Sequence, residues 1–173
     1  TWLRRHGAAC PPAVFVATDY TCIPFTEETD CDAYVIPAAE LTGEFCGWGI
    51  PAEKLHPLGI PVRQQFRDAA DRDAERRKLG LDPARQYLLL SGGSIGCGSL
   101  AQVVAQLRRE LKPEQTMIVI CGNHQRLFQR LSRLYSGDAQ VQLLQSTPHM
   151  ASYMRACDVF FTKPGGLSST EAA

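Results

Sequence analysis

The chain has 173 residues, of which 18 are basic and 18 acidic, so its formal net charge is zero. This balance argues against broad, sequence-independent binding of nucleic acid, which needs a positive surface. No apolar run approaches the roughly 18 residues of a membrane-spanning helix, and we find no signal-peptide pattern. The hydrophobic fraction of 45% is enough for a packed core.

The first third of the chain predicts a small set of strands and loops. Residues 13–17 form an apolar run that ends at Thr18-Asp19, and residues 33–36 form a second run, followed by a short helix through about Phe45. Two Gly-Ile-Pro units, at residues 49–51 and 59–61, indicate loops and a crossover. We place a domain boundary near residues 61–70, and the charge-dense stretch 67–78 predicts a solvated helix.

From residue 87 onward, short apolar runs alternate with amphipathic helical patterns. The runs lie at residues 87–90, 117–121, 141–144 and 159–162. Leu100, Val103, Val104, Leu107 and Leu111 share one helical face, and Leu127, Leu131 and Leu134 repeat the spacing. Thr147-Pro148 is typical of a helix start, with Thr147 as N-cap. This alternation predicts βαβ units and a parallel sheet buried on both faces, with ligands at the carboxyl ends of its strands.

A glycine-rich turn at residues 91–98 follows the first of these runs. It begins Ser-Gly-Gly-Ser and includes Gly92, Gly93 and Ser94. The glycine spacing does not meet the dinucleotide fingerprint, and no Gly-Lys-Ser/Thr follows to make a P-loop. The end of the next strand carries Gly122 where that fingerprint would want an acidic residue. A phosphate-cradling loop and a turn kept only for close packing both remain open.

A second turn, at residues 163–171, follows the last run and strengthens the phosphate interpretation. Gly165 and Gly166 leave no side chain to block a ligand, and Ser169 is one of three hydroxyl residues near a helix start. Glu171 either accepts hydrogen bonds from ribose hydroxyls or complements the helix dipole. Lys163 either counters a phosphate charge or is solvated. Together the two turns indicate a nucleotide-sugar site.

Other candidate chemistry is weaker. We find no Ser-His-Asp or Cys-His arrangement for nucleophilic catalysis. Asp19, at the end of a strand, is either a residue facing an interdomain cleft or an ordinary turn aspartate. The seven cysteines form no CxxC pair, which fits a reduced, cytoplasmic protein with buried thiols. The ligand clusters of a zinc site are missing, so we expect no metal.

These motifs, taken in order, resemble glycosyltransferase family 28, and in particular the monogalactosyldiacylglycerol synthases and the processive diacylglycerol glucosyltransferases. The resemblance is carried by residues 16–19, 49–51, 59–62, 91–94, 120–123 and 162–172. Its most specific part is the Lys-Pro-Gly-Gly turn with the downstream Glu171. It implies an α/β fold of the GT-B type, with Rossmann-like parallel sheets covered by helices on both faces. Residues 1–62 would be the end of an acceptor-side N-terminal domain, and residues 63–173 a truncated UDP-sugar-binding domain.

The resemblance also implies site residues and a reaction. Gly93 and Ser94 would meet the diphosphate, with Gly92, Gly122, Lys163, Gly165, Gly166 and Ser169 in the same donor site. Glu171 would bind the ribose, and the backbone near Thr147, with Met150 beneath it, would hold the uracil. The enzyme would invert the anomeric carbon of a hexose from UDP-glucose or UDP-galactose as it passes to a diacylglycerol-type lipid, without a metal or other cofactor.

The resemblance leaves the catalytic base open. The family often has a histidine a few residues after the Thr-Asp pair, which this chain lacks, and the N-terminal loop with the family's candidate base is absent. Asp19 is therefore only a weak candidate. The chain starts without Met and stops at Ala173 inside an expected helix, so we expect an inactive fragment.

The whole protein would be cytoplasmic and peripheral at the inner face of the cell membrane, which it would contact through the missing N-terminal half. Two alternatives remain. One is an enzyme like the UDP-N-acetylglucosamine 2-epimerases, and the other is a non-catalytic nucleotide-sugar-binding module.

Overall fold

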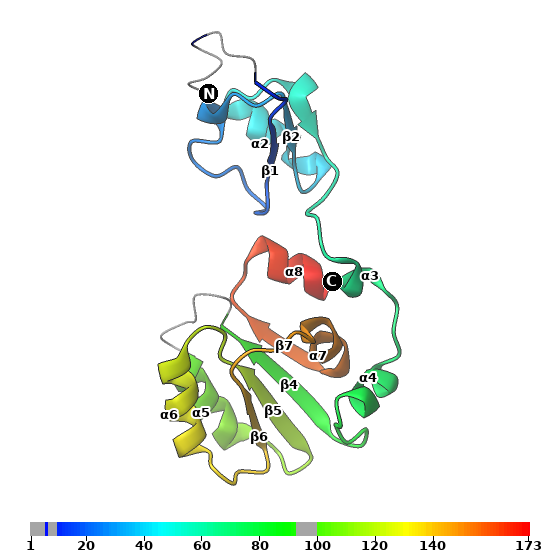
Figure 1. Ribbon diagram of the computed structural model, residues 1–173, viewed down its shortest axis with the longest axis vertical. Helices are drawn as coiled ribbons and strands as arrows, with labels where there is room; N and C mark the ends of the chain where they lie inside the picture. Colours follow the sequence, from blue (N-terminus) through cyan, green and yellow to red (C-terminus); the bar gives the residue numbers. More distant parts are fainter. Residues whose placement is uncertain (1–5, 7–9, 93–99) are drawn as a thin grey trace. The chain divides into compact units, whose positions relative to one another are not determined.

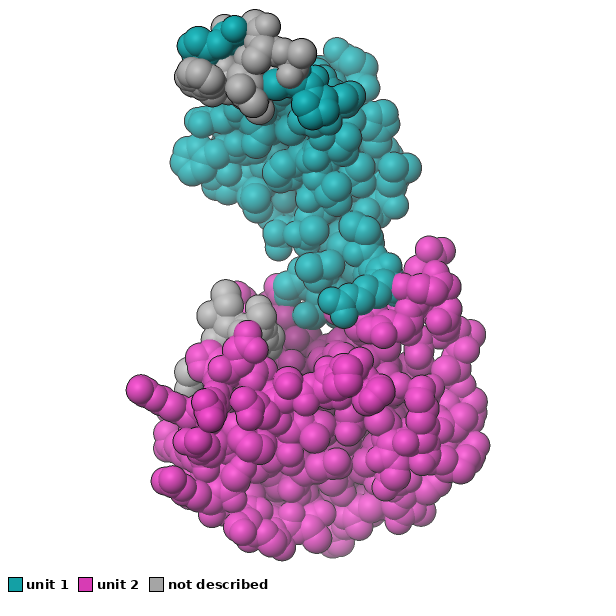
Figure 2. Space-filling view, viewed as in Figure 1, with its two compact units in different colours: residues 1–63, 165–170 teal, residues 64–164, 171–173 magenta. Residues whose placement is uncertain are grey.

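A computed structural model describes His6, residues 10–92 and residues 100–173 of the chain. These residues form two compact units (Figures 1 and 2). The first comprises residues 1–63 together with residues 165–170, and the second comprises residues 64–164 together with residues 171–173. The division of the main chain therefore falls between Arg63 and Gln64.

The first unit contains a three-stranded parallel sheet in the order β1-β2-β3. Its strands and helices are β1 (Val14–Val16), η1 (Glu27–Thr29), β2 (Ala33–Val35), η2 (Ala39–Leu41), α2 (Thr42–Gly47), η3 (Ala52–Lys54) and β3 (Leu55–His56). Tyr34, Ile36 and Phe45 are almost completely buried in its core, with Cys22 and Cys31 beside them. The core therefore joins the sheet to α2, which packs through Phe45.

The second unit contains a four-stranded parallel sheet in the order β6-β5-β4-β7. Its elements are α3 (Gln64–Arg67), α4 (Arg72–Lys78), β4 (Gln86–Ser91), α5 (Leu100–Glu110), β5 (Gln115–Ile120), α6 (Gln125–Leu134), β6 (Val141–Leu144), α7 (Met150–Ala156) and β7 (Val159–Thr162). The last helix, α8 (Gly166–Ala172), follows β7. The four strands and the helices between them match the sequence prediction closely.

Alternate residues of the strands face opposite sides of this sheet, as the strand period of two requires. On one side Leu89 and Ile118 pack with Tyr153 of α7. On the other side Leu90 and Val119 pack with residues of α5 and α6. Figure 1 shows α5 and α6 together on one face and α7 on the other. The predicted α/β fold, with a parallel sheet covered by helices on both faces, is confirmed.

The charge-dense stretch 67–78 differs from the prediction of one solvated helix. It holds the end of α3 and the separate helix α4, which begins after Asp71, whose carboxylate accepts a hydrogen bond from the backbone N–H of Ala74. Glu75 and Arg76 are buried in α4. The prediction was wrong here because α4 packs on α7 and covers the charged middle of the stretch.

The predicted helix start at Thr147 is also shifted. α7 begins at Met150, and the Thr147 hydroxyl accepts a hydrogen bond of 3.0 Å from the backbone N–H of His149. Thr147 thus orders the turn that leads into the helix and is not its N-cap.

The cysteines of the described residues are all free thiols. Cys22, Cys121 and Cys157 are buried, and burial raises the pKa of each of these thiols. A raised pKa keeps a thiol protonated and unreactive at neutral pH. Cys97 lies outside the described residues.

Candidate nucleotide-sugar site

The strand order of the second unit creates a switch point between β4 and β7. From β4 the chain moves outward to β5 and then β6, and it returns on the other side of β4 as β7. The connection that leaves β4 enters α5 on one face of the sheet, and the connection that returns to β7 passes through α7 on the other face. In open α/β sheets a crevice forms at such a point, outside the carboxyl ends of the strands, and this is where ligands bind.

Both predicted glycine turns begin at this switch point. Ser91 and Thr162, the last residues of β4 and β7, are partners in the parallel register. Gly92 follows Ser91 directly, and Lys163 follows Thr162. The structure therefore brings the starts of the two turns together from positions that are 71 residues apart in sequence. Gly93 and Ser94 lie outside the described residues.

A pocket opens at the same place. Its lining combines the apolar side chains of Leu90, Leu100, Val103 and Phe161 with Ser91, Gly92, Thr162, Lys163 and Pro164. Lys163 is exposed, so its ammonium group is available to an anion. The apolar lining from α5 could not be predicted from the sequence, because nothing local indicates which helical residues face a strand end.

The two glycines of the second turn have different surroundings. A Cβ atom added at Gly165 would meet open space, whereas one added at Gly166 would come within 1.9 Å of the backbone oxygen of Thr18. Glycine is therefore required at position 166 by the close approach of Thr18 and Asp19, which belong to the same unit as Gly166. Only Gly165 has the open space that we expected at both positions for an approaching ligand.

The remaining residues of the second turn lie on or before α8. The backbone N–H of Ser169 donates to the Gly165 oxygen at 3.0 Å, and the Thr170 hydroxyl donates to the Gly166 oxygen at 2.7 Å. These bonds fix the first turn of the helix. Glu171, partly buried, is its sixth residue, in the second turn.

Two further predicted site residues follow other strands of the second unit. Gly122 occupies the turn after β5 with a positive φ of 63°, a conformation that favours glycine. Met150 opens α7 and packs against the core beside Tyr87 and Leu89. Because the chain enters α7 directly from the carboxyl end of β6, Thr147 and Met150 lie at the same edge of the sheet as the two glycine turns.

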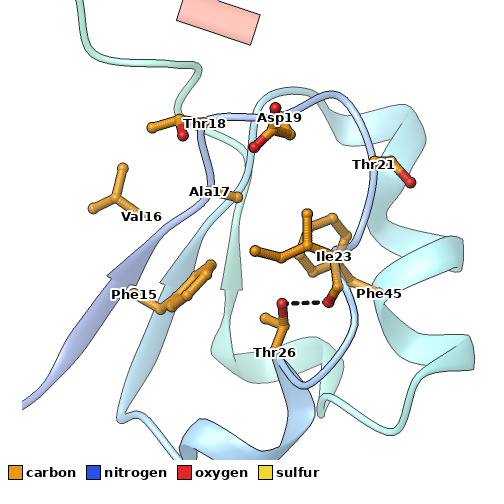
Figure 3. A pocket seen from close by; sticks show the side chains of 9 residues that line it. All are labelled: Phe15, Val16, Ala17, Thr18, Asp19, Thr21, Ile23, Thr26 and Phe45. Carbon is orange, nitrogen blue, oxygen red and sulfur yellow. Dashed lines mark hydrogen bonds between the residues drawn. The ribbon is translucent and has the colours of Figure 1, made fainter. Parts of the chain in front are cut away.

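Asp19 lines a separate pocket at the carboxyl end of β1, in the first unit (Figure 3). Apolar side chains, among them Phe15, Ile23 and Phe45, line this pocket together with Thr18 and Thr21. Of these lining residues, only Asp19 was a site residue predicted from the sequence. Phe45 was not foreseen because it comes from α2, far along the chain.

Glu44 holds the loop around this pocket in place. One of its carboxylate oxygens accepts hydrogen bonds from the Thr21 hydroxyl at 2.6 Å and from the backbone N–H of Cys22 at 2.7 Å. The bond from Thr21, and then that from Cys22, lower the pKa of Glu44. A charged Glu44 therefore ties the loop after Asp19 to α2.

Neither metal-binding clusters nor membrane spans are found where the structure is described. Across His6, residues 10–92 and residues 100–173, no group of three or more His, Cys, Asp or Glu side chains is placed to hold a metal ion. Within the same residues, no helix has the length and apolar character needed to cross a bilayer.

Comparison with solved structures defines the class of fold. The chain aligns over 98% of its length with 44% of MurG from Acinetobacter baumannii, with a TM-score of 0.61 and 17% identity. It aligns over 90% of its length with 48% of a UDP-GlcNAc 2-epimerase from Neisseria meningitidis solved with UDP-GlcNAc, with a TM-score of 0.61 and 10% identity. The chain has the Rossmann-like α/β fold of the GT-B type.

Sequence comparison then identifies the relatives. Residues 1–62 match the family described as monogalactosyldiacylglycerol (MGDG) synthase. A processive diacylglycerol beta-glucosyltransferase of Staphylococcus carnosus is 30% identical over 161 residues, which are 93% of this chain and 41% of that protein. A probable chloroplastic monogalactosyldiacylglycerol synthase 2 of Oryza sativa subsp. indica is 30% identical over 181 residues, covering 99% of this chain and 38% of that protein.

These matches confirm the resemblance found in the sequence. The chain is a relative of the glycosyltransferases of the monogalactosyldiacylglycerol synthase and processive diacylglycerol glucosyltransferase type. It spans about two-fifths of the length of the curated relatives that it matches, 41% of one and 38% of the other.

Proposed function

We propose that this chain carries the donor-binding part of an inverting glycosyltransferase, which moves a hexose from a UDP-sugar to a diacylglycerol-type lipid in glycolipid synthesis. The observation that supports this most directly is the pairing of Ser91 with Thr162 at the switch point of the sheet. This pairing places the starts of both glycine turns side by side, at the edge where open α/β sheets bind nucleotides. The named relatives support the transferase class.

The donor would lie along this edge. Backbone N–H groups of Gly92, Gly93 and Ser94 would bind the diphosphate from one turn, and Gly165, with Gly166 and Ser169 behind it, from the other. The exposed ammonium group of Lys163 would offset phosphate charge. Glu171 would accept hydrogen bonds from the ribose, and the segment from Thr147 to Met150 would hold the uracil, with Gly122 in the turn between.

The proposed reaction needs no metal. A general base takes the proton of the acceptor hydroxyl, whose oxygen attacks the anomeric carbon from the face opposite the UDP. The bond from that carbon to the diphosphate oxygen breaks, and UDP leaves with its new charge stabilised by the backbone donors and Lys163. The base itself is unknown, and Asp19, in the pocket after β1, is a weak candidate for it.

The same proposal assigns the two parts of the chain. Residues 1–62 would belong to the acceptor side and residues 63–173 to the UDP-sugar-binding domain. The whole protein would be cytoplasmic and peripheral at the inner face of the cell membrane. Its donor would be UDP-glucose or UDP-galactose.

An enzyme like the UDP-GlcNAc 2-epimerases is the second candidate, because the same fold is found in the Neisseria protein. The relatives with 30% identity are named as lipid glycosyltransferases, so the sequence favours transfer. A non-catalytic nucleotide-sugar-binding module would bind the donor without either reaction. Assays of hexose transfer and of epimerisation on the full-length protein separate the three.

Replacing Glu171 with Ala in the full-length protein tests the donor site. We expect UDP affinity to fall by about 1–3 kcal/mol, the usual value of hydrogen bonds to a charged group. Titration calorimetry measures the change. Glu114→Ala is the control, because Glu114 is exposed just before β5, at the opposite edge of the sheet. Unchanged UDP affinity in Glu171→Ala would mean that this residue has only a packing role.

A further inference from the structure

Helix α6 carries an exposed basic face. Arg126, Arg130 and Arg133 are all exposed, and their spacing of four and then three residues places them in one stripe along the helix. The opposite face of α6 packs into the core of the second unit through Leu131, which is completely buried, and Leu127. These three arginines, which we call the basic stripe, therefore point away from the sheet.

The charge of the basic stripe is not balanced by its neighbours. Among the residues that the structure describes, no ion pair or hydrogen bond engages the side chain of any of the three arginines. The chain has no acidic residue from position 115 to position 137, and the next acid, Asp138, is already paired with Arg108. On α5, which covers the same face of the sheet (Figure 1), the charges of the exposed Arg109 and Glu110 cancel. The basic stripe is therefore a local excess of positive charge on a chain whose net charge is zero.

This arrangement of charge is unfavourable for α6 on its own. Like charges four residues apart on a helix, as at Arg126 and Arg130, repel each other. Arg126 also lies in the first turn, at the positive end of the helix dipole, where α6 has no acidic residue to offset it. An anion bound along the basic stripe would relieve both effects, so α6 gains from a negatively charged partner.

The partner that fits this surface best is a lipid bilayer. Leu134, the last residue of α6, is 63% exposed and directly follows Arg133. An exposed apolar side chain next to arginines suits the headgroup region of a bilayer, which takes up both kinds of group. A nucleic acid offers phosphates to the arginines but no apolar layer to Leu134, and the zero net charge of the chain disfavours it.

We propose that the basic stripe of α6, with Leu134 at its end, binds the surface of a membrane that contains anionic lipids. The inference rests on the proposed function, in which the acceptor is a lipid, and it gives this chain a membrane contact of its own. Because the apolar face of α6 stays in the core, the helix lies on the surface and does not enter the bilayer. Each arginine held near an anionic surface strengthens binding about fivefold.

Co-sedimentation of the full-length protein with vesicles tests the proposal. Vesicles of phosphatidylcholine are compared with vesicles of phosphatidylcholine and phosphatidylglycerol in equal parts. We expect tighter binding to the anionic vesicles, and we expect this preference to vanish in about 1 M salt, which shortens the screening length to about 3 Å. The triple variant Arg126→Gln, Arg130→Gln, Arg133→Gln should bind the anionic vesicles about a hundredfold more weakly and the phosphatidylcholine vesicles unchanged. Lysine at the same three positions should keep the preference, because it keeps the charge.

A matched control removes the same charge outside α6. It is the triple variant Arg63→Gln, Arg67→Gln, Arg77→Gln, at three exposed positions. We expect it to weaken binding to the anionic vesicles by about threefold at most, because only the net charge of the protein changes. If thermal unfolding shows that the triple variant of α6 does not fold, Arg130→Gln alone replaces it and should weaken this binding about fivefold.

The outcomes separate this proposal from the proposed function. Equal losses in the two triple variants, or no preference for anionic vesicles in the unchanged protein, overturn the role of α6. Tighter binding of the unchanged protein to duplex DNA than to anionic vesicles overturns it as well and assigns the basic stripe to nucleic acid. Hexose transfer to diacylglycerol in neutral detergent micelles tests the proposed function alone, and there the triple variant of α6 should be as active as the unchanged protein. An unchanged protein that transfers no hexose in those micelles contradicts the proposed function, whatever its binding to vesicles.

Discussion

At the scale of single residues, an ion pair between Arg108 and Asp138 holds the turn before β6 in place. Arg108 of α5 donates to both oxygens of Asp138, at 2.6 Å and 3.2 Å, in the turn before β6. The backbone N–H of Gln140 also donates to Asp138, at 3.0 Å. The bond from Arg108, the larger cause, lowers the pKa of Asp138. The ion pair ties α5 to the turn that starts the outermost strand.

This pair predicts a dependence of stability on pH. The unfolded carboxyl has its ordinary pKa of 3.8, and the folded one lies lower, so the unfolded chain takes up the proton first as the pH falls. The stabilisation is therefore complete above about pH 5 and is lost as the pH falls through the folded pKa. We expect Asp138→Asn to lower the free energy of unfolding by about 1 kcal/mol at pH 7, and we expect this difference to shrink steadily as the pH falls below about 5.

Urea unfolding followed by circular dichroism at several pH values measures this difference. Asp73→Asn is the control, since Asp73 is exposed in α4. A difference for Asp138→Asn that stays constant from about pH 7 to about pH 3 would show that the pair contributes nothing through ionisation.

At the scale of elements, α4 is joined to the sheet by a buried cation. The Arg76 guanidinium donates to the oxygens of Ala156 and Pro83 and to the Asp158 carboxylate, at 2.9, 3.1 and 2.7 Å. It also lies over the Tyr87 ring, 5.3 Å from its centre. Asp158 in turn accepts from the Tyr87 backbone N–H at 2.7 Å. One side chain thus connects α4, the end of α7 and the start of β7.

Arg76→Ala is expected to lower the free energy of unfolding by about 3 kcal/mol or more, because it leaves Asp158 without its main cation and empties a packed site. Urea unfolding measures the change. The neighbouring Arg77 has a side chain that is 65% exposed, so Arg77→Ala should stay within about 0.5 kcal/mol. Similar effects for both substitutions would contradict the role assigned to Arg76.

The elements themselves were largely predictable. Strands β4, β5, β6 and β7 appear as apolar runs because both faces of the parallel sheet are buried, and α5 and α6 show the spacing of one buried helical face. The prediction failed for α4, because charge alone cannot show that Glu75 and Arg76 become buried where α4 packs on α7. A buried charge needs an opposite charge beside it, and the partner of Arg76, Asp158, lies far along the chain.

At the scale of the molecule, the chain has two units and covers about two-fifths of the relatives it matches. We therefore expect the isolated 173-residue chain to bind UDP weakly and to transfer no hexose. Incubation with radiolabelled UDP-glucose or UDP-galactose and diacylglycerol vesicles tests this, with the full-length protein as the positive control. Transfer of hexose by the isolated chain would contradict this expectation.

The amino-acid sequence alone determined the class of fold, the four strands of the second sheet and the two glycine turns, because each depends on residues within a few positions of one another. The family resemblance followed from those same local motifs. Only the tertiary structure decided that β7 lies beside β4, that Gly166 is needed against Thr18, and that Glu75 and Arg76 are buried. These features join residues far apart along the chain, and local periodicity does not record which distant residues meet.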